Sequence, residues 1–350
     1  MIEAKQLHKE KQEIYYEIPK KNPLYLGIFI DTGSCTIAVF DKANGGMETL
    51  IIREQDILPA ILETIRDFAH KKNVKFIAAG IMNKSENINT ETLDEFFSKL
   101  WLEDDIVPFS FKVSGISEKS KAKKLASEAK KQFLEDNIVD IKFDNNRRVI
   151  CSHLVRPVDY KKTIDAQDYN TLIDLAEKTK KRGERVAFFS STPRGGGVAL
   201  MRHSLIRLYS QLGVDVKWYV MGNENPEIFQ ITKKKFHNIL QGVAPDKEVL
   251  TDKEKKAFLD WSTKNARSFN DVFKWATTIV IDDPQPSGMI PYIKKVNPDA
   301  KIIYRSHIQI DTSLLSEPQQ NNTWEFIWQN VKLADIFVSH PIEEFVPPMV

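Results

Sequence analysis

The sequence Arg185-Val-Ala-Phe-Phe-Ser-Ser-Thr-Pro-Arg-Gly-Gly-Gly-Val-Ala199 is the most informative part of this chain. Residues 186–190 have the pattern of a short buried strand, and an apolar helical pattern begins at Val198. Between them, Gly195, Gly196 and Gly197 allow the backbone to take positive φ and to approach a ligand closely. A helix N-terminus carries about half a positive charge. Strand, glycine turn and helix therefore predict an anion-binding loop, for which phosphate is the natural occupant.

The spacing of this loop differs from two common phosphate-binding motifs. No Lys-Ser/Thr pair follows Gly197, as a P-loop requires, and the pattern G-x-G-x-x-G is absent. A flexible turn that binds no ligand is therefore the alternative interpretation of the local sequence.

Composition limits the class of protein. A chain of 350 residues predicts two domains, and its 50 basic and 48 acidic residues argue against a dedicated nucleic-acid-binding protein. The two cysteines form no C-x-x-C motif, so we expect no metal site, no redox pair and a reducing compartment. The sequence shows no signal-peptide pattern and no apolar run long enough to span a membrane. We therefore expect a cytoplasmic protein that needs no cofactor.

Hydrophobic periodicity predicts four segments. The second segment, 23–114, contains two strands within 24–40, on either side of a turn at 31–34. The fourth segment alternates strands and helices from residue 185 onward, with one helix predicted at 226–240. This alternation predicts a doubly wound parallel sheet. The predicted segments are a loose arm at 1–22, an α/β extension at 23–114, a charged connector at 115–165 and a Rossmann-like domain at 166–350.

The Asp31-Thr-Gly-Ser34 turn has three interpretations. An aspartic-protease site would need a second carboxylate of the same kind to share a proton, and no second Asp-Thr/Ser-Gly occurs. A phosphate loop of the actin and sugar-kinase type suits the hairpin, but no convincing second phosphate loop accompanies it. The third interpretation is a glycine turn without a ligand.

Polar residues follow three predicted strands of the C-terminal segment. In an open α/β sheet, ligands bind outside the carboxyl ends of the strands. Carboxylates and amides accept hydrogen bonds from sugar hydroxyls, and Arg or His donates to phosphate. These residues thus predict a site for a phosphorylated, polyhydroxylated ligand, although His307 could be structural and either aspartate could only cap a turn. The residues are Asp282, Asp283, Gln285, Arg305, His307, Ser339 and His340.

Four short motifs carry a family resemblance: Thr192-Pro-Arg-Gly-Gly-Gly-Val-Ala199, Asp283-Pro-Gln-Pro286, Tyr304-Arg-Ser-His307 and Ser339-His-Pro341. Together they resemble the N-terminal half of the trehalose synthase/trehalose phosphorylase family, retaining glycosyltransferases of the two-Rossmann GT-B architecture. The resemblance covers about 150–350. The long N-terminal extension resembles the fungal trehalose phosphorylases, also described as clock-controlled proteins.

The resemblance implies reversible glucosyl transfer. A phosphorylase converts trehalose and phosphate into glucose 1-phosphate and glucose. By resemblance, Gly195, Gly196 and Gly197, with Arg194, would bind the donor phosphate, while the catalytic residues stay unassigned. The acceptor glucose would be lined by Asp283, Gln285, Arg305 and His307.

The resemblance also implies a second Rossmann domain that supplies most of the donor-binding residues, and the sequence stops at Val350 before such a domain. We therefore expect this chain alone to be inactive, an expectation that formation of glucose 1-phosphate would overturn. Three alternatives stay open: a trehalose synthase that uses nucleotide-activated glucose, a non-catalytic sugar- or phosphate-binding protein, and a kinase that uses residues 31–34. The expected partners are a small sugar with phosphate or a sugar nucleotide, without nucleic acid or membrane. A homo-oligomer is compatible with the sequence.

Overall fold

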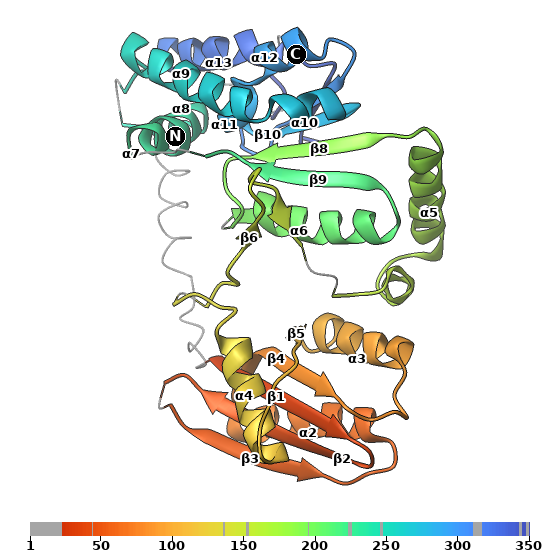
Figure 1. The fold of residues 1–350 in the computed structure, drawn as a ribbon. Helices are drawn as coiled ribbons and strands as arrows, with labels where there is room; N and C mark the ends of the chain where they lie inside the picture. The colour runs from red at the N-terminus through yellow and green to blue at the C-terminus, as the bar shows by residue number, and fades with distance from the viewer. Residues whose placement is uncertain are drawn as a thin grey trace. The chain divides into compact units, whose positions relative to one another are not determined.

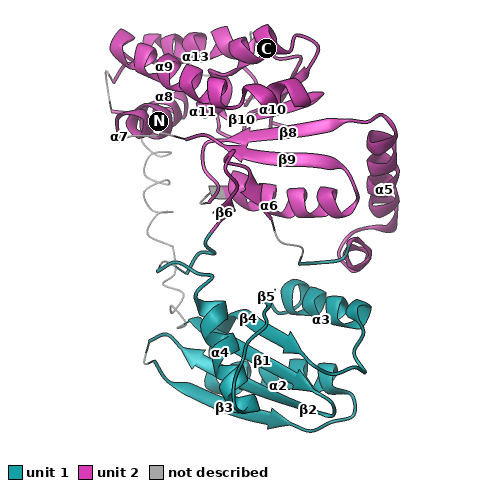
Figure 2. Cartoon of the chain, viewed as in Figure 1, with its two compact units in different colours: residues 1–140, 154–156 teal, residues 141–153, 157–350 magenta. Residues whose placement is uncertain are grey.

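The computed structural model divides the chain into two compact units (Figures 1 and 2). The first is formed by residues up to 140 with 154–156, and the second by 141–153 with 157–350. The structure describes residues 23–43, 45–135, 137–151, 154–194, 196–222, 226–245, 248–310, 317–342, 345–347 and 350. The arm predicted at 1–22 lies outside the described residues.

The first unit is built on a five-stranded mixed sheet with the order β3-β2-β1-β4-β5. β1 and β2 form the predicted hairpin, antiparallel from Leu24 opposite Asp41 to Asp31 opposite Ser34. β1 is central and almost wholly buried, as its apolar sequence requires, and it pairs in parallel with β4. The strands are β1 (Pro23–Asp31), β2 (Ser34–Asp41), β3 (Met47–Ile52), β4 (Lys75–Asn83) and β5 (Val107–Ser110).

Helices cover both faces of this first sheet. α2 (Ile57–Lys72) and α3 (Thr90–Leu102) pack on the face that carries Leu26 and Ile28. α4 (Glu118–Lys130) packs on the other face, against Phe29 and Tyr25. Its backbone passes so close to the sheet that glycines of β1 and β4 are needed beneath it. A Cβ built on Gly27 would lie 1.9 Å from the Ala122 carbonyl oxygen, and one on Gly80 would lie 2.2 Å from that of Leu125.

The charged stretch 115–165 is divided between the two units, where the sequence had predicted a connector. α4 supplies one face of the first unit because its buried stripe, Ala122, Leu125, Ala126 and Ala129, is apolar despite the surrounding lysines. The short hairpin of β6 (Lys142–Phe143) and β7 (Val149–Ile150) belongs to the second unit, as does the single 3-10 turn η1 (Pro157–Lys162).

The second unit is built on a five-stranded sheet with the order β12-β11-β10-β8-β9, in which every neighbouring pair is parallel. The chain reverses its direction of winding between β8 and β10, which makes their carboxyl ends the topological switch point. The strands are β8 (Arg185–Ser190), β9 (Asp215–Val220), β10 (Thr278–Asp282), β11 (Lys301–Arg305) and β12 (Ile336–Val338).

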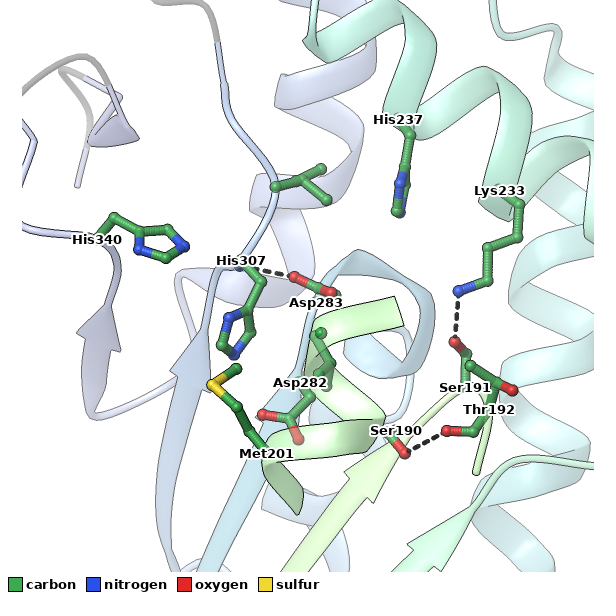
Figure 3. Close-up of a pocket in the computed structure, with 13 residues that line it drawn as sticks. Ser190, Ser191, Thr192, Met201, Lys233, His237, Asp282, Asp283, His307 and His340 are labelled. Atoms are coloured by element: carbon green, nitrogen blue, oxygen red, sulfur yellow. Dashed lines mark hydrogen bonds between the residues drawn. The ribbon is translucent and has the colours of Figure 1, made fainter. Parts of the chain in front are cut away.

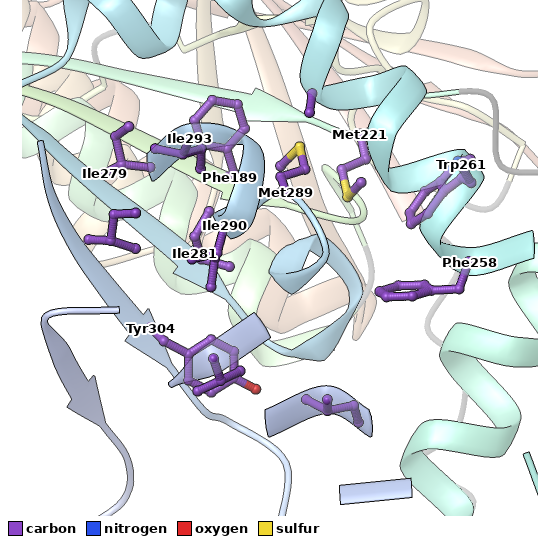
Figure 4. Packing of buried hydrophobic residues seen from close by; sticks show 14 of the residues in the cluster. Phe189, Met221, Phe258, Trp261, Ile279, Ile281, Met289, Ile290, Ile293 and Tyr304 are labelled. Atoms are coloured by element: carbon purple, nitrogen blue, oxygen red, sulfur yellow. The ribbon is translucent and has the colours of Figure 1, made fainter. Parts of the chain in front are cut away.

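Helices cover both faces of the second sheet, as a doubly wound fold requires. Phe188 faces α6 in a small cluster with Trp218, while Ala187 and Phe189 face the large core on the opposite side (Figure 4). This alternation follows from the two-residue period of a strand. The predicted Rossmann-like α/β class is thereby confirmed. The helices are α5 (Ala166–Lys181), α6 (Gly196–Gln211), α7 (Pro226–Phe229), α8 (Phe236–Leu240), α9 (Asp252–Ser268), α10 (Asn270–Trp275), α11 (Pro284–Ser287), α12 (Ile290–Val296) and α13 (Pro318–Val331).

One helical segment of the second unit is irregular. The segment 226–240 contains a π-helical turn, η2 (Gln230–Lys235), between α7 and α8.

No helix within the described ranges is long and apolar enough to cross a membrane.

Candidate functional site

A cavity of about 360 Å³ opens in the second unit at the carboxyl ends of β8 and β10 (Figure 3). This is the switch point of the sheet, where the parallel strands and their loops leave a crevice. Polar side chains from five regions of the chain converge on it. The lining residues are Ser190, Ser191, Thr192, Gly197, Val198, Met201, Lys233, His237, Asp282, Asp283, His307, Ile308 and His340.

The loop between β8 and α6 forms one wall. Thr192 Oγ1 donates to the Arg194 carbonyl oxygen at 2.7 Å, which tightens the turn. His203 Nε2 donates to the Pro193 carbonyl oxygen at 2.8 Å, because a carbonyl can only accept. Trp218 Nε1, from the neighbouring strand β9, donates to Ser190 Oγ at 2.8 Å. The loop is thus held by side chains of α6 and β9, and Gly197 in the first turn of α6 faces the cavity.

Asp282 ends β10 and is the centre of a buried ion network. Arg202 from α6 donates to both carboxylate oxygens, with Nη2 2.7 Å from Oδ2 and 3.0 Å from Oδ1. Arg305 from β11 adds a bond from Nε to Oδ1 at 2.9 Å. The Arg202 and Asp282 side chains are 1% and 0% exposed, and the guanidinium lies 3.7 Å from the centroid of the Phe188 ring. This network fixes the floor of the cavity, because a buried carboxylate needs such partners.

The next residue after Asp282 is Asp283, which has φ of +67° and a nearly buried side chain. Its Oδ1 accepts from the His307 amide at 2.7 Å. Burial, with the neighbouring Asp282 adding to it, raises the pKa of the Asp283 carboxyl to about 6. A left-handed backbone is uncommon for a non-glycine residue and costs on the order of 1–3 kcal/mol where it is strained. A buried carboxyl group with a raised pKa at an uncommon backbone position makes Asp283 a candidate functional residue.

His307 and His340 border the carboxylate side of the cavity, with ring centroids 5.9 Å apart. Burial, reinforced by Arg305, lowers the pKa of His307 to about 4, so its ring is neutral at neutral pH. His307 Nε2 is buried and meets no hydrogen-bond partner among the described residues. A neutral imidazole beside a carboxylate is suited to bind hydroxyl groups, since it can donate and accept.

The structure brings some predicted site residues to the cavity and leaves others away from it. Gly197, Asp283 and His307 line it. Arg305 and Gln285 are not among its lining residues: Arg305 pairs with Asp282, and Gln285 is 1% exposed and bonded to His237. Arg194 is exposed and does not line the cavity, Gly196 begins α6, and Gly195 lies outside the described residues. Direct ligand contact by these residues stays a prediction.

The sequence did not point to Lys233 and His237, which come from η2 and α8 and not from a strand end. Their spacing of four on a predicted helix, one turn apart, was the available signal. The Asp31–Ser34 turn belongs to the first unit, where Thr32 N donates to Asp31 Oδ1 and Gly33 takes φ of +71°.

Two protein families match the chain in succession. Residues 23–167 match "Trehalose phosphorylase-like, N-terminal domain", and residues 188–347 match "Trehalose synthase, N-terminal domain". A trehalose phosphorylase of Grifola frondosa is 31% identical over 367 residues, covering 82% of this chain and 48% of that protein. One of Pleurotus pulmonarius is 44% identical over 209 residues, 56% of this chain and 27% of that protein. A trehalose synthase of Pyrococcus horikoshii is 34% identical over 191 residues, covering 54% and 41%.

The fold and site define an α/β protein with a polar crevice at the switch point of a doubly wound sheet. With the two successive family matches, this chain belongs to the trehalose phosphorylase-like family, as its motifs predicted. The chain spans about half the length of the Grifola relative and less of the others.

Proposed function

We propose that this chain forms the acceptor side of a retaining trehalose phosphorylase with GT-B architecture. The reaction breaks the glycosidic C1–O bond of trehalose and forms a C1–O bond to phosphate. The proton of the attacking phosphate passes to the departing glucose oxygen, so that glucose 1-phosphate and glucose result. The observation that carries this proposal is the crevice at the switch point, which offers Asp283 and His307 in a chain whose relatives are named trehalose phosphorylases.

The cavity supplies suitable groups for a glucose unit. Asp283 accepts from sugar hydroxyls, and His307 offers a buried Nε2 that has no hydrogen-bond partner within the described part of the chain. Asp282, held by Arg202 and Arg305, keeps the floor rigid, which favours one orientation of the sugar. Met201, Val198 and Ile308 add apolar surface against which a sugar ring can pack.

The match over residues 23–167 favours a phosphorylase over a synthase. That segment matches a domain described as trehalose phosphorylase-like, and the Grifola phosphorylase aligns with 82% of the chain. The trehalose synthase of Pyrococcus horikoshii aligns with 54% of the chain. A synthase would require nucleotide-activated glucose in place of phosphate.

Calorimetric titration of residues 1–350 with glucose, trehalose and sucrose tests the proposal. We expect saturable binding of glucose or trehalose, little binding of sucrose, and a loss of about tenfold or more in affinity for Asp283→Asn. Asp271→Asn, at an exposed position of α10, is the matched control and should bind as the unchanged chain does. The absence of glucose and trehalose binding, or equal affinity in Asp283→Asn, would contradict the proposal. Enhanced sugar binding with a sugar nucleotide but not with phosphate would favour the synthase.

A further inference from the structure

The π-helical turn η2 and helix α8 deliver two side chains to the wall of the cavity opposite His307 and His340 (Figure 3). The sequence predicted one continuous helix over 226–240, but η2 makes a wider turn there. Such turns are rare and occur frequently at functional sites. Lys233, on η2, extends to the loop after β8, where its Nζ donates to Ser191 Oγ at 2.9 Å (Figure 3). His237, on α8, lines the same cavity.

Gln285 determines which nitrogen of His237 carries the proton. The Gln285 amide nitrogen lies 2.5 Å from His237 Nε2 and 3.4 Å from the Thr232 carbonyl oxygen. An amide nitrogen only donates, and the Thr232 carbonyl only accepts, so the amide is oriented with its nitrogen toward both. His237 Nε2 is therefore the acceptor, and the proton of the neutral ring is on Nδ1.

The wall formed by Lys233, Ser191 and His237 carries a positive charge. Burial, aided by Lys233, lowers the pKa of His237 to about 4, so the ring is neutral at neutral pH. Among the described residues that line the cavity, Lys233 is the only lysine or arginine. The wall thus contains one ammonium, one hydroxyl and one imidazole N–H, each of which is able to donate a hydrogen bond. Three donors with one positive charge suit an oxyanion better than a sugar hydroxyl, because charge-assisted bonds are the stronger ones.

We propose that Lys233, Ser191 and His237 form an oxyanion subsite that takes a phosphate group, with Gln285 as a positioning residue behind His237. The inference rests on the proposed function and adds to it: the sugar lies against Asp283 and His307, and the phosphate lies against η2. The phosphate group can belong to inorganic phosphate or to glucose 1-phosphate. Both carry the same oxyanion, and only the second also carries a sugar for the opposite wall.

Titration of residues 1–350 with inorganic phosphate and with glucose 1-phosphate, followed by 31P NMR and calorimetry, tests the subsite. Lys233→Met should weaken both ligands by about tenfold or more, since it removes a charge-assisted bond. Lys234→Met is the matched control, because this neighbour on η2 is exposed. It should leave both affinities unchanged. Equal phosphate affinity in Lys233→Met and the unchanged chain would overturn the subsite.

Two further measurements separate this inference from the proposed function. Glucose binding should survive in Lys233→Met, so retained sugar affinity with unchanged phosphate affinity would refute the subsite alone. Imidazole 15N shifts of His237 at neutral pH should show a protonated Nδ1, and Gln285→Glu, which offers only acceptors, should move the proton to Nε2. A protonated Nε2 in the unchanged chain would overturn the positioning role of Gln285.

Discussion

Asp283 combines a left-handed backbone, a nearly buried carboxyl group and a raised pKa at a single position. Asparagine is a close substitute, because it tolerates positive φ and keeps an oxygen that can accept from the His307 amide. The Asp283→Asn variant therefore removes the ionisation with little change of shape, and the effect of that ionisation on stability can be measured.

Asp283→Asn should become more stable relative to the unchanged protein as pH rises. The folded pKa is about 6, above the unfolded value of about 3.9. Between these values the folded state binds more protons, so the contribution of Asp283 to stability falls with rising pH. The difference in the free energy of unfolding should grow from about pH 4 to about pH 6 and then stay constant at about 3 kcal/mol. Urea unfolding at several pH values measures it.

His237 and His307 titrate with the opposite sign, because their folded pKa values are lowered to about 4. Their contribution to stability rises with pH up to their unfolded value, about 6.5. Both are present in each protein, so their effects largely cancel in the comparison. A stability difference that is flat from pH 4 to pH 7 would contradict the raised pKa of Asp283.

Arg202 of α6 should contribute strongly to the stability of the second unit, because its charged side chain is buried against Asp282. Arg202→Met leaves Asp282 with Arg305, whose side chain is 18% exposed, as its remaining cationic partner in the described part of the chain. Breaking a buried pair typically costs about 3–5 kcal/mol. We expect a loss of about 3 kcal/mol in chemical denaturation, because Arg305 remains. Lys256→Met, in the exposed pair with Asp260, is the control and should change stability by less than about 0.5 kcal/mol. Comparable effects of the two substitutions would argue against the buried network.

At the scale of elements, short-range signals in the sequence fix where two of the helices begin or end. Thr251 and Glu254 form the capping box that opens α9, with the Thr251 Oγ1 accepting from the Glu254 amide and the Glu254 side chain accepting from the Thr251 amide. Gly183 takes φ of +66° just after α5, as a helix-ending glycine does. These signals lie within a few residues of each other, so the sequence alone contains the interaction.

Close packing of α4 on the first sheet leads to a prediction for Gly27. A Cβ at this position would collide with the backbone of α4, which cannot move aside without losing its own packing. Gly27→Ala should therefore destabilise the first unit by roughly 1–3 kcal/mol or more, measured by thermal and urea unfolding.

Gly197→Ala is the comparison for this substitution. A Cβ on Gly197 meets no atom within 4 Å, and the residue lies in the first turn of α6. Alanine favours helix over glycine by about 1 kcal/mol or less, so we expect no loss of stability there. A destabilisation by Gly27→Ala no larger than that by Gly197→Ala would show that the sheet does not need its glycine.

At the scale of the molecule, each unit has a core of its own. The first unit buries Leu26, Ile28, Ile61 and Phe96 among others, and the second buries a separate and larger cluster. We expect residues 23–140 alone to fold and to unfold cooperatively, because their sheet is covered on both faces.

Circular dichroism and urea unfolding of the isolated segment 23–140 measure this. The segment 23–113, which lacks α4, is the matched control and should lose cooperative unfolding, since the face around Phe29 and Ala38 becomes exposed. Cooperative folding of 23–113, or an unfolded 23–140, would contradict the assignment of α4 to the first unit.

The sequence by itself determined the alternation of strands and helices, the glycine loop before α6, the hairpin of the first unit and the strand ends that carry Asp282, Asp283 and His307. Periodicity, caps and turns are local, and the carboxyl ends of parallel strands must meet at one edge. The family followed from the same short motifs.

Other features depended on the tertiary structure. Arg202 looks like a solvent-exposed helix residue in sequence but is buried by its pairing with Asp282, 80 positions away. Gln285 follows a strand end but points at His237, and η2 brings Lys233 to Ser191. These placements join residues far apart in the chain, because buried charges and amides take the partners that the assembled fold supplies.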